Sequence, residues 1–292
     1  MNLNILKQRA KAFDYLFDAV VVTDLEGIIT DWNKGSEALY GYSKEEAIGQ
    51  PVNMLHVPED TDHITSSVIS AVTEFGKWSG EVRMLHKDGR IGWVESMCVP
   101  MFDENKQMVG ALGINRDITD RKHEAEHLHY LAHYDQLTEV PNRYLLIDRI
   151  GHLISQSERN KSSFALLYID LDKFKTINDT KGHAFGDQVL KEVALRLKET
   201  IRKSDTVARI GGDEFVLLLE SISSKKKISA MADELIKTLN RKFDINGEEF
   251  EVSCSIGIAI YPEQGNSTDA LLAAADTAMY KAKRKGRSTY EI

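Results

Sequence analysis

Arg209-Ile210-Gly211-Gly212-Asp213-Glu214-Phe215 places two consecutive glycines directly before two carboxylates. Apolar stretches lie on both sides, at 206–210 and 215–219, and predict a β-hairpin whose turn carries the glycines. Glycine adopts left-handed backbone conformations and lets a ligand approach the main chain closely. Asp213 and Glu214 offer the oxygen ligands that Mg²⁺ prefers. The turn is therefore a candidate metal site, although the same residues also suit an ordinary solvated hairpin tip.

A second group of acidic residues follows an apolar run upstream. Residues 164–169 are almost continuously apolar, as in a buried central strand, and Asp170-Leu171-Asp172-Lys173-Phe174-Lys175 comes next. If the strand continues to Asp172, Asp170 and Asp172 project from the same face, because side chains alternate along a strand. The alternative is that Asp172 only begins a helix. A polar, glycine-rich stretch at 177–187 then precedes an amphipathic segment at 190–201.

Taken in order, these motifs resemble the GGDEF domain of diguanylate cyclases over residues 135–292. Asp135-Gln136-Leu137-Thr138 and Pro141-Asn142-Arg143 match the opening of that domain, and the aspartate motif and the glycine hairpin follow in the family's order. The resemblance implies a central mixed β-sheet flanked by helices. One departure is Glu139-Val140, where the family usually has Gly-Leu. We expect this change to be tolerated, because the position lies outside the chemistry.

The resemblance also implies an activity, the condensation of two GTP molecules into cyclic di-GMP with release of two pyrophosphates. Each GTP is held by one domain of an antiparallel pair, so a homodimer is expected. Matched position by position, Asp170, Asp213 and Glu214 are the expected catalytic carboxylates. Asp170 and Asp213 are expected to bind the metal, and Glu214 is a further metal ligand or assists removal of the hydroxyl proton. Leu171 is expected to offer its backbone carbonyl to the same Mg²⁺ or Mn²⁺. Two metals can steady the attacking and leaving oxygens together. We expect both aspartates to lie at turns.

Further residues match the family's substrate contacts. Asn178 and Asp187 correspond to its guanine-reading pair, and an amide with a carboxylate can satisfy both the donors and the acceptors of guanine. Turn capping is the alternative role for this pair. The segment after the aspartates is expected to begin a helix whose N–H groups face phosphate. Cations near the end of the chain correspond to triphosphate contacts, although they also suit a helix C-terminus. The complete expected set is Asn178, Asp187, Phe174, Lys175, Gly211, Gly212, Lys283 and Arg287.

The segment Arg202-Lys203-Ser204-Asp205 ends just before the hairpin, where the family has its inhibitory product site. An arginine can present a two-pronged donor to guanine or phosphate, and an aspartate can accept guanine N–H groups. The resemblance therefore implies that Arg202 and Asp205 bind cyclic di-GMP and inhibit synthesis. The alternative is a surface ion pair of little energetic consequence.

The first half of the chain has a different pattern. Alternating apolar residues at 18–23 and 27–32 predict two strands, short helices follow at 43–48 and 62–75, and three further strands are predicted at 77–86, 91–101 and 108–117. This order resembles a PAS sensor domain, a five-stranded antiparallel sheet with helices. Asp31-Trp32-Asn33 and Asp117-Ile118-Thr119-Asp120-Arg121 also match it. We expect a two-domain protein of the α/β (α+β) class: an N-terminal helix at 1–18, a PAS domain at 19–118, a helical linker at 119–134 and a GGDEF domain at 135–292.

The ligand of the PAS domain is not evident from sequence. The cysteine motif of a flavin photoadduct is missing, and Cys98 and Cys254 (the latter in a predicted strand at 250–260) are expected to be buried apolar residues in a reducing compartment. Haem would need an axial histidine, and neither His56 nor His63 matches the expected helix position.

Two predicted helices concern assembly. Residues 119–134 contain no glycine or proline and carry apolar residues at heptad-like intervals, so a paired helix there could transmit a PAS rearrangement to the catalytic halves. Residues 1–18 are expected to form an amphipathic helix that serves dimerisation.

Composition excludes several other classes. The chain has 292 residues, with 37 Lys and Arg against 45 Asp and Glu, which disfavours nucleic-acid binding. No stretch approaches the ~20 apolar residues of a spanning helix, and Lys7, Arg9 and Lys11 interrupt any secretory signal, so no membrane contact and a cytoplasmic location are expected. The alternative function is a catalytically silent receptor for GTP or cyclic di-GMP. A phosphodiesterase is disfavoured, because Glu37-Ala38-Leu39 lies inside the PAS segment and no second catalytic domain fits.

Overall fold

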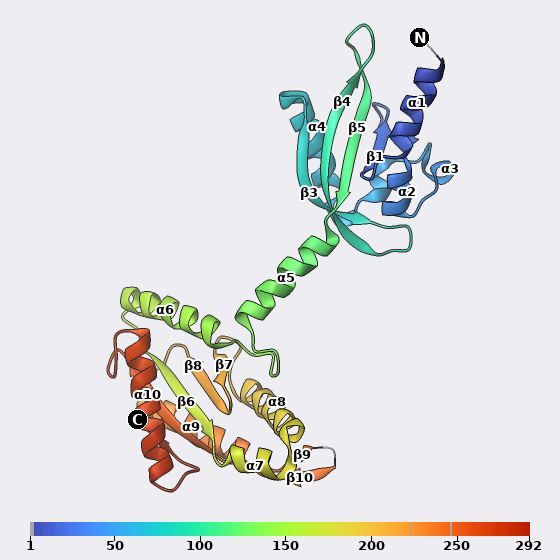
Figure 1. Cartoon of the computed structure of the whole chain (residues 1–292). Coiled ribbons are helices and arrows are strands. Elements are labelled where there is room, and N and C mark those ends of the chain that lie inside the picture. The colour runs from blue at the N-terminus through green and yellow to red at the C-terminus, as the bar shows by residue number, and fades with distance from the viewer. Residues whose placement is uncertain (1–2, 223, 246) are drawn as a thin grey trace. The chain divides into compact units, whose positions relative to one another are not determined.

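The computed structural model describes residues 3–222, 224–245 and 247–292. The chain forms two compact units, Met1–His127 and Leu128–Ile292, whose elements are labelled in Figure 1. Met1 and Asn2, the first residues of the predicted N-terminal helix, lie outside the described residues. Among the helices that are described, none combines the length and the apolar character needed to cross a membrane.

The N-terminal unit is built on a five-stranded antiparallel sheet with strand order β2-β1-β5-β4-β3. Two strands, then helices, then three strands follow one another along the chain, as the sequence predicts. The order brings the first strand against the last, so the sheet is assembled from residues almost 100 positions apart. The strands are β1 (Ala19–Thr23), β2 (Ile29–Trp32), β3 (Trp78–Leu85), β4 (Ile91–Phe102) and β5 (Met108–Asp117).

Helices of this unit pack against the sheet, and polar side chains cap the starts of α2 and α3. Asn33 caps α2 by accepting from Ser36 N–H, and it also accepts from Val20 N–H, which ties the helix to β1. Trp32 beside it is fully buried in the core. The helices are α1 (Leu3–Asp14), α2 (Lys34–Tyr40), α3 (Lys44–Ala47), the short 3₁₀ turns η1 (Val52–Leu55) and η2 (Pro58–Asp60), and α4 (Thr61–Phe75).

A single helix, α5 (Thr119–His133), follows β5, and the border between the two units falls inside it. The sequence predicts a continuous helix over 119–134, and α5 ends one residue earlier. Its apolar residues are not buried within the chain: Leu128 is 66% exposed.

The C-terminal unit contains a five-stranded mixed sheet with order β12-β11-β6-β8-β7, in which only the β11–β12 pair is parallel. A separate two-stranded sheet pairs β9 with β10. The central position of β6 explains its continuous apolar sequence, because both of its faces are covered. The strands are β6 (Phe164–Leu171), β7 (Thr206–Gly211), β8 (Glu214–Leu219), β9 (Phe243–Ile245), β10 (Glu248–Phe250), β11 (Cys254–Tyr261) and β12 (Tyr290–Glu291).

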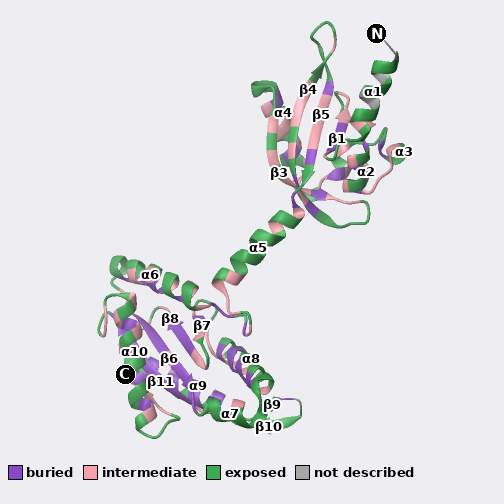
Figure 2. Ribbon diagram, in the orientation of Figure 1, coloured by how far each residue is buried: buried purple, intermediate pink, exposed green. Residues whose placement is uncertain are grey.

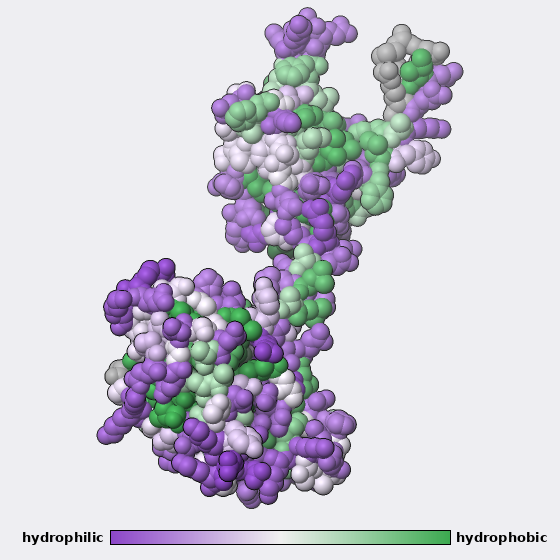
Figure 3. Space-filling view, turned by 60° about the vertical axis from the view of Figure 1, so that its left-hand side comes forward, coloured by the Kyte–Doolittle hydropathy of each residue, from purple (hydrophilic) through white to green (hydrophobic). Residues whose placement is uncertain are grey.

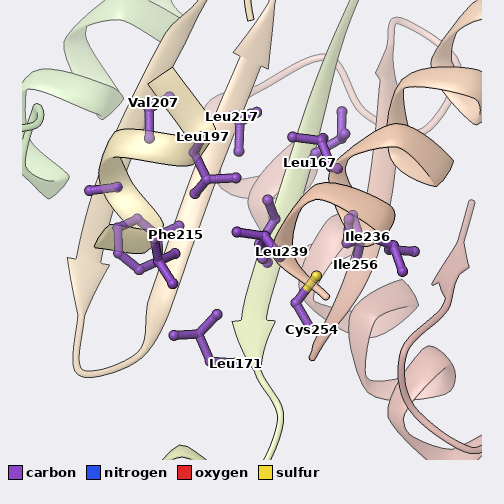
Figure 4. Close-up of a cluster of buried hydrophobic side chains, with 14 of the residues drawn as sticks. Leu167, Leu171, Leu197, Val207, Phe215, Leu217, Ile236, Leu239, Cys254 and Ile256 are labelled. Carbon is purple, nitrogen blue, oxygen red and sulfur yellow. The ribbon is translucent and has the colours of Figure 1, made fainter. Parts of the chain in front are cut away.

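Alternate residues of β6 enter two different cores. Leu167, Ile169 and Leu171 join the cluster beneath α8 and α9, part of which is drawn in Figure 4, whereas Phe164 and Leu166 join the cluster beneath α6 and α10. Figure 2 shows the resulting buried strands between mostly exposed outer helix faces. Hydrophilic residues make up most of the surface of this unit that is visible in Figure 3. The helices are α6 (Arg143–Asn160), α7 (Phe174–Lys181), α8 (His183–Thr200), α9 (Lys225–Leu239) and α10 (Thr268–Arg284).

Three sequence-based expectations differ from the structure. The helix expected at 190–201 begins at His183, so the polar stretch before it is helical. The single strand expected at 250–260 is two strands, β10 and β11, separated by residues 251–253. Cys254 is buried as expected, but Cys98 is only half-buried, because it faces a cavity in the N-terminal unit.

Candidate active site

The glycine-rich hairpin forms as predicted. β7 ends at Gly211 and β8 begins at Glu214, so Gly212 and Asp213 make the turn. Gly212 has φ 53°, a left-handed conformation that glycine adopts without strain. The Arg209 guanidinium donates two hydrogen bonds to the Gly212 carbonyl, at 3.0 and 2.7 Å. The arginine at the start of the motif therefore holds the turn in shape.

Asp135 at the opening of the domain anchors this arginine. Its carboxylate accepts from Arg209 Nη1 at 2.9 and 3.1 Å, and from the N–H and hydroxyl of Thr138 at 2.9 and 2.6 Å. Burial alone would raise the pKa of Asp135, but the hydrogen bonds from Thr138 and Arg209 outweigh it and lower the pKa. The opening motif and the hairpin, about 70 residues apart in sequence, thus form one hydrogen-bonded unit.

Glu139, the departure from the family pattern, lies in the same opening segment with φ 55°. This left-handed conformation is natural for glycine and costs other residues roughly 1 kcal/mol or more. The turn is nevertheless closed, because Glu139 N–H donates to the Asp135 carbonyl at 2.9 Å and the Glu139 carbonyl accepts from Lys198 Nζ at 3.2 Å. Val140 is fully buried in the core, as a leucine would be.

The three predicted carboxylates come together at one end of the sheet. Asp170 on β6 lies opposite Glu214 on β8, and Leu171 N–H donates to the Asp213 carbonyl at 3.3 Å. Asp213 lies at a turn as predicted, but the same expectation is wrong for Asp170, which is the penultimate residue of a buried strand and only 7% exposed. Strand pairing, rather than a shared loop, therefore brings these acids together.

Electrostatics distinguish Asp170 from its neighbours. Burial raises the pKa of Asp170 to about 6, and the nearby carboxylates of Asp213 and Glu214 add to the rise. Lys283 Nζ, 2.7 Å from Asp170 Oδ2, opposes this shift without cancelling it. This end of the sheet therefore carries negative charge that Lys283 only partly neutralises.

The same residues fit a hard divalent cation. Mg²⁺ usually takes one or two protein carboxylates and completes its coordination with water and substrate phosphates. In the described part of the chain, no three His, Cys, Asp or Glu side chains form a ready metal cage. A nucleotide would thus have to supply the remaining ligands beside Asp170, Asp213 and Glu214.

Two further residues lie near the carboxylates: Tyr168, which the sequence did not single out, and Asp172, which it placed on the same strand face as Asp170 without a site role. Tyr168 shares a face of β6 with Asp170 and forms a side-chain hydrogen bond with Glu214, and its burial raises its pKa. Asp172 is 6% exposed and accepts from the hydroxyls of Ser253 and Ser255, both at 2.8 Å. The two-residue spacing from Asp170 was the available signal for both, since 168, 170 and 172 alternate with the core positions.

Asp172 does not cap a helix, which was its alternative role. The residue preceding α7 is Lys173, and it makes no side-chain cap. Instead, Asp172 Oδ2 accepts from Ser288 N–H at 3.1 Å, and Asp172 Oδ1 lies 4.0 Å from Arg287 Nε. Arg287 and Ser288 both have left-handed backbones, with φ 66° and 50°. The buried carboxylate thereby holds a strained segment that carries one of the predicted phosphate contacts.

The predicted guanine-reading pair lies on two helices rather than at turns. Asn178 is in α7 and Asp187, which is exposed, is in α8. Asn178 Oδ1 is buried without a hydrogen-bond partner. It packs so closely on Gly186 that a Cβ there would lie 1.9 Å from it. A buried amide oxygen without a partner is costly and indicates a position for an N–H donor.

The predicted phosphate contacts lie near the same end. α7 begins at Phe174 as expected, with Phe174 buried and Lys175 exposed in its first turn. Lys283 belongs to α10 and is paired with Asp170, so it already faces the carboxylates.

Arg202 and Asp205 line a separate cavity of about 300 Å³. Asp205 does not pair with the Arg202 guanidinium, because its carboxylate accepts from the main-chain N–H groups of Arg202 and Glu220 at 3.2 and 3.1 Å. The side chain of Arg202 is exposed. Arg149 and Lys198, which the sequence did not single out, line the same cavity, and with Arg202 and Lys203 they outnumber the acids Glu139 and Asp205.

Comparisons with known proteins agree with this arrangement. A family model described as diguanylate cyclase, GGDEF domain, matches residues 132–289, and a PAS fold model matches residues 29–115. Diguanylate cyclase TpbB of Pseudomonas aeruginosa is 41% identical over 56% of this chain and 38% of its own length. The solved GGDEF domain of TpbB matches 55% of this chain and 93% of that structure, with a TM-score of 0.53.

Other relatives match different portions. Cyclic di-GMP phosphodiesterase PdeR of Escherichia coli is 33% identical over 93% of this chain and 41% of its own length. A crystal structure of a PAS domain from Colwellia psychrerythraea is 81% identical over 40% of this chain and 99% of that structure, with a TM-score of 0.39. The chain spans less than half the length of both curated relatives. On the match over residues 132–289, more than half of its length, the chain belongs to the GGDEF diguanylate cyclase family.

Proposed function

We propose that this chain is a diguanylate cyclase that joins two GTP molecules into cyclic di-GMP and releases two pyrophosphates. The observation that carries the proposal is the meeting of Asp170, Asp213 and Glu214 at one end of the sheet, where burial and mutual repulsion raise the pKa of Asp170. A site with uncompensated negative charge beside a cationic helix end suits a metal-bound triphosphate.

In this reaction the 3′-oxygen of one GTP forms a bond to the α-phosphorus of the other, and the bond from that phosphorus to pyrophosphate breaks. Asp170, Asp213, Glu214 and the Leu171 carbonyl would hold Mg²⁺ or Mn²⁺, which neutralises the charge that develops on the phosphate oxygens. In its alternative role, Glu214 does not bind the metal but assists removal of the proton of the attacking hydroxyl, and Tyr168 orients it by hydrogen bonding. The 3′-oxygen of the second GTP then attacks the α-phosphorus of the first in the same way, which releases the second pyrophosphate and closes the ring.

The remaining residues position each nucleotide. The partnerless Asn178 Oδ1 accepts an N–H of guanine, and Asp187 completes the contact to its edge. Lys175 and the first N–H groups of α7 face the phosphates, and Lys283 and Arg287 supply positive charge to them. Gly211 and Gly212 leave the main chain of the hairpin open to close approach by the nucleotide.

Each domain holds one GTP, so synthesis requires two copies in an antiparallel pair. The PAS domain controls this pairing through α5. The proposed organisation is an N-terminal helix at 1–18, a PAS domain at 19–118, a helical linker at 119–134 and a GGDEF domain at 135–292. The protein works in the cytoplasm without contact to membrane or nucleic acid.

The test is synthesis by the purified chain with GTP and Mg²⁺, followed by chromatography of the nucleotides. Asp213→Ala should lower product formation by about 100-fold or more without loss of folding, because Asp213 lies in a turn outside the core. Asp233→Ala is a matched control on the exposed face of α9 and should retain full activity. Binding of GTP by the native chain without any product would instead support the silent-receptor alternative.

We assign product inhibition to binding of cyclic di-GMP in the cavity that Arg202 lines. Bound cyclic di-GMP carries two phosphates, and the cluster of Arg149, Lys198 and Arg202 provides the matching charge. Arg202→Ala should leave the initial rate unchanged. It should raise, by about tenfold or more, the concentration of cyclic di-GMP at which the rate is half-inhibited. A time course with added product measures both quantities, and unchanged inhibition would remove Arg202 from this role.

A further inference from the structure

Asp172, directly after β6, is a buried carboxylate that the proposed catalysis leaves unused. Its side chain is only 2% exposed. Its N–H donates to the Ser253 carbonyl at 2.8 Å, so main-chain pairing continues past the end of the strand. The carboxylate accepts three hydrogen bonds, from the hydroxyls of Ser253 and Ser255 and from Ser288 N–H. So few lone pairs remain free that the residue has little to offer a metal ion.

The contact to Ser288 belongs to the connection between α10 and β12, which has an unusual backbone. Gly286, Arg287 and Ser288 are consecutive and have φ of 128°, 66° and 50°. Each left-handed residue other than glycine costs roughly 1 kcal/mol or more and persists only where its surroundings hold it. Ser288 is held on two sides, because its N–H donates to Asp172 Oδ2 at 3.1 Å and its hydroxyl accepts from Asn240 Nδ2 at 2.9 Å.

The guanidinium of Arg287 faces the same carboxylate with one edge only. Its Nε lies 4.0 Å from Asp172 Oδ1, which is an ion pair rather than a hydrogen bond. The Arg287 side chain is 51% exposed and forms no hydrogen bond with the residues that the structure describes. Attraction to Asp172 orients the Nε edge inward and leaves the two terminal nitrogens free for an anion.

This arrangement lies beside the pair formed by Lys283 and Asp170. Asp170 and Asp172 project from the same face of the chain, because side chains alternate along a strand. Lys283 Nζ is 2.7 Å from Asp170 Oδ2, and Arg287 follows four residues later beside Asp172. Two cations therefore lie over two neighbouring aspartates, and only one of those aspartates belongs to the proposed metal site.

We infer that Asp172 is a positioning residue for the polyphosphate of GTP. It fixes the left-handed connection through Ser288 N–H and orients Arg287 through Nε, so that the free end of this guanidinium meets the phosphates. The inference rests on the proposed function, which assigns Arg287 to the triphosphate. A purely structural role would instead make Asp172 important for folding and indifferent to the number of phosphates on the ligand.

The substitution Asp172→Asn separates these roles. The amide oxygen can remain opposite Ser288 N–H, and the hydroxyl of Ser255 can rotate to accept from the new NH₂ group. The connection is then still held, but the NH₂ group faces Arg287 Nε, so the attraction that orients the guanidinium is lost. The expected result is a folded chain that binds polyphosphate poorly.

The test is a double-mutant cycle on nucleotide binding by the full chain, measured by calorimetry with Mg²⁺. The probe is 3′-deoxy-GTP, which lacks the attacking oxygen, so binding is observed without synthesis. Asp172→Asn and Arg287→Ala should each weaken it about tenfold, and the double variant should bind no more weakly than Arg287→Ala alone. GMP, which lacks the outer phosphates, should bind each variant within about twofold of the native chain.

Two further variants control for loss of stability. Ser288→Gly keeps Asp172 but loosens the connection, because glycine adopts φ 50° without strain, and it should weaken 3′-deoxy-GTP only while Arg287 is present. Cys254→Ala lies between the two serines and faces the buried core, so it should lower the unfolding temperature and leave the Kd unchanged.

Independent effects of Asp172→Asn and Arg287→Ala, equal weakening of GMP, or a comparable loss of affinity in Cys254→Ala would overturn the inference. Synthesis from GTP by the native chain is assayed separately. Independent effects in a chain that synthesises cyclic di-GMP contradict the inference alone, whereas coupled effects on binding in a chain without synthesis contradict only the proposed reaction.

Discussion

At the scale of single residues, Gly186 is the most constrained position near the proposed guanine contact. Gly186→Ala would place a Cβ 1.9 Å from Asn178 Oδ1, so the amide has to move. We expect the KM for GTP to rise about tenfold or more, while kcat falls less, because the change affects nucleotide binding rather than the carboxylates. Steady-state kinetics measure both constants.

Gly151→Ala is the matched control for this substitution. Gly151 lies in α6, and nothing is within 4 Å of a Cβ built there. It should leave KM unchanged and raise stability by about 0.5–1 kcal/mol, as expected for alanine in a helix interior. Equal KM values for the two variants would show that Gly186 does not affect nucleotide binding.

The sequence predicted which acids gather at the site but not all of their environment. Asp170 and Asp213 stood out because they interrupt apolar or glycine-rich segments. The role of Asp172 could not be predicted, because its donors Ser253, Ser255 and Ser288 lie 81 or more residues further along the chain. Serines carry no signal of their own, and only the pairing of β6 with β11 brings two of them near.

At the scale of elements, the bond network from Asp135 to the hairpin yields a prediction on acid stability. The folded-state pKa of Asp135 is lowered, so its ionised form contributes stability above its ordinary pKa and loses it as pH falls through the folded value. The contribution should therefore be complete at neutral pH, begin to fall near the ordinary pKa of about 4, and be lost as pH drops further through the folded-state pKa.

Asp135→Asn should lower the free energy of unfolding at pH 7 by about 1–2 kcal/mol, because the amide loses the charge that strengthens the hydrogen bonds from Arg209 and replaces one accepting oxygen by a donating NH₂. The difference in the free energy of unfolding between this variant and the native chain should shrink toward pH 3. Urea titrations at several pH values measure it, and a difference independent of pH would show that the charge of Asp135 is not its cause.

Element types were predictable from periodicity, whereas some boundaries were not. Gly182 and the polar residues after it suggested a loop, yet α8 begins at His183, because Phe185 packs against the core and supports the extra turn. The break between β10 and β11 was hidden because residues 250–260 alternate well enough for one strand. There Phe250 pairs within the small sheet and Cys254 within the large one.

At the scale of the whole molecule, each unit has a core of its own. The cluster around Trp32 draws all its residues from the N-terminal unit, and those around Phe215 and Phe164 draw theirs from the C-terminal unit. The two-domain organisation was predictable because the motifs of the two halves differ. The cavity in the N-terminal unit was not, since its lining is scattered over many short segments.

Separate cores predict two thermal unfolding transitions. Leu217→Ala removes a fully buried side chain and should cost about 2–5 kcal/mol, lowering one transition by about 5–15 °C and leaving the other in place. Ile29→Ala in the N-terminal core is the reciprocal variant. Calorimetry measures both, and a joint shift of both transitions in either variant would contradict independent folding.

The left-handed Glu139 has a mechanical consequence. A glycine would let this segment adopt many conformations, whereas a glutamate restricts it to few, so the connection behaves as a stiff joint instead of a loose hinge. Asp135, four residues earlier, is bonded to the hairpin through Arg209. Under the proposed regulation, a twist arriving along α5 would therefore displace the hairpin turn through Asp135 and Arg209, with little of the motion lost in a flexible segment.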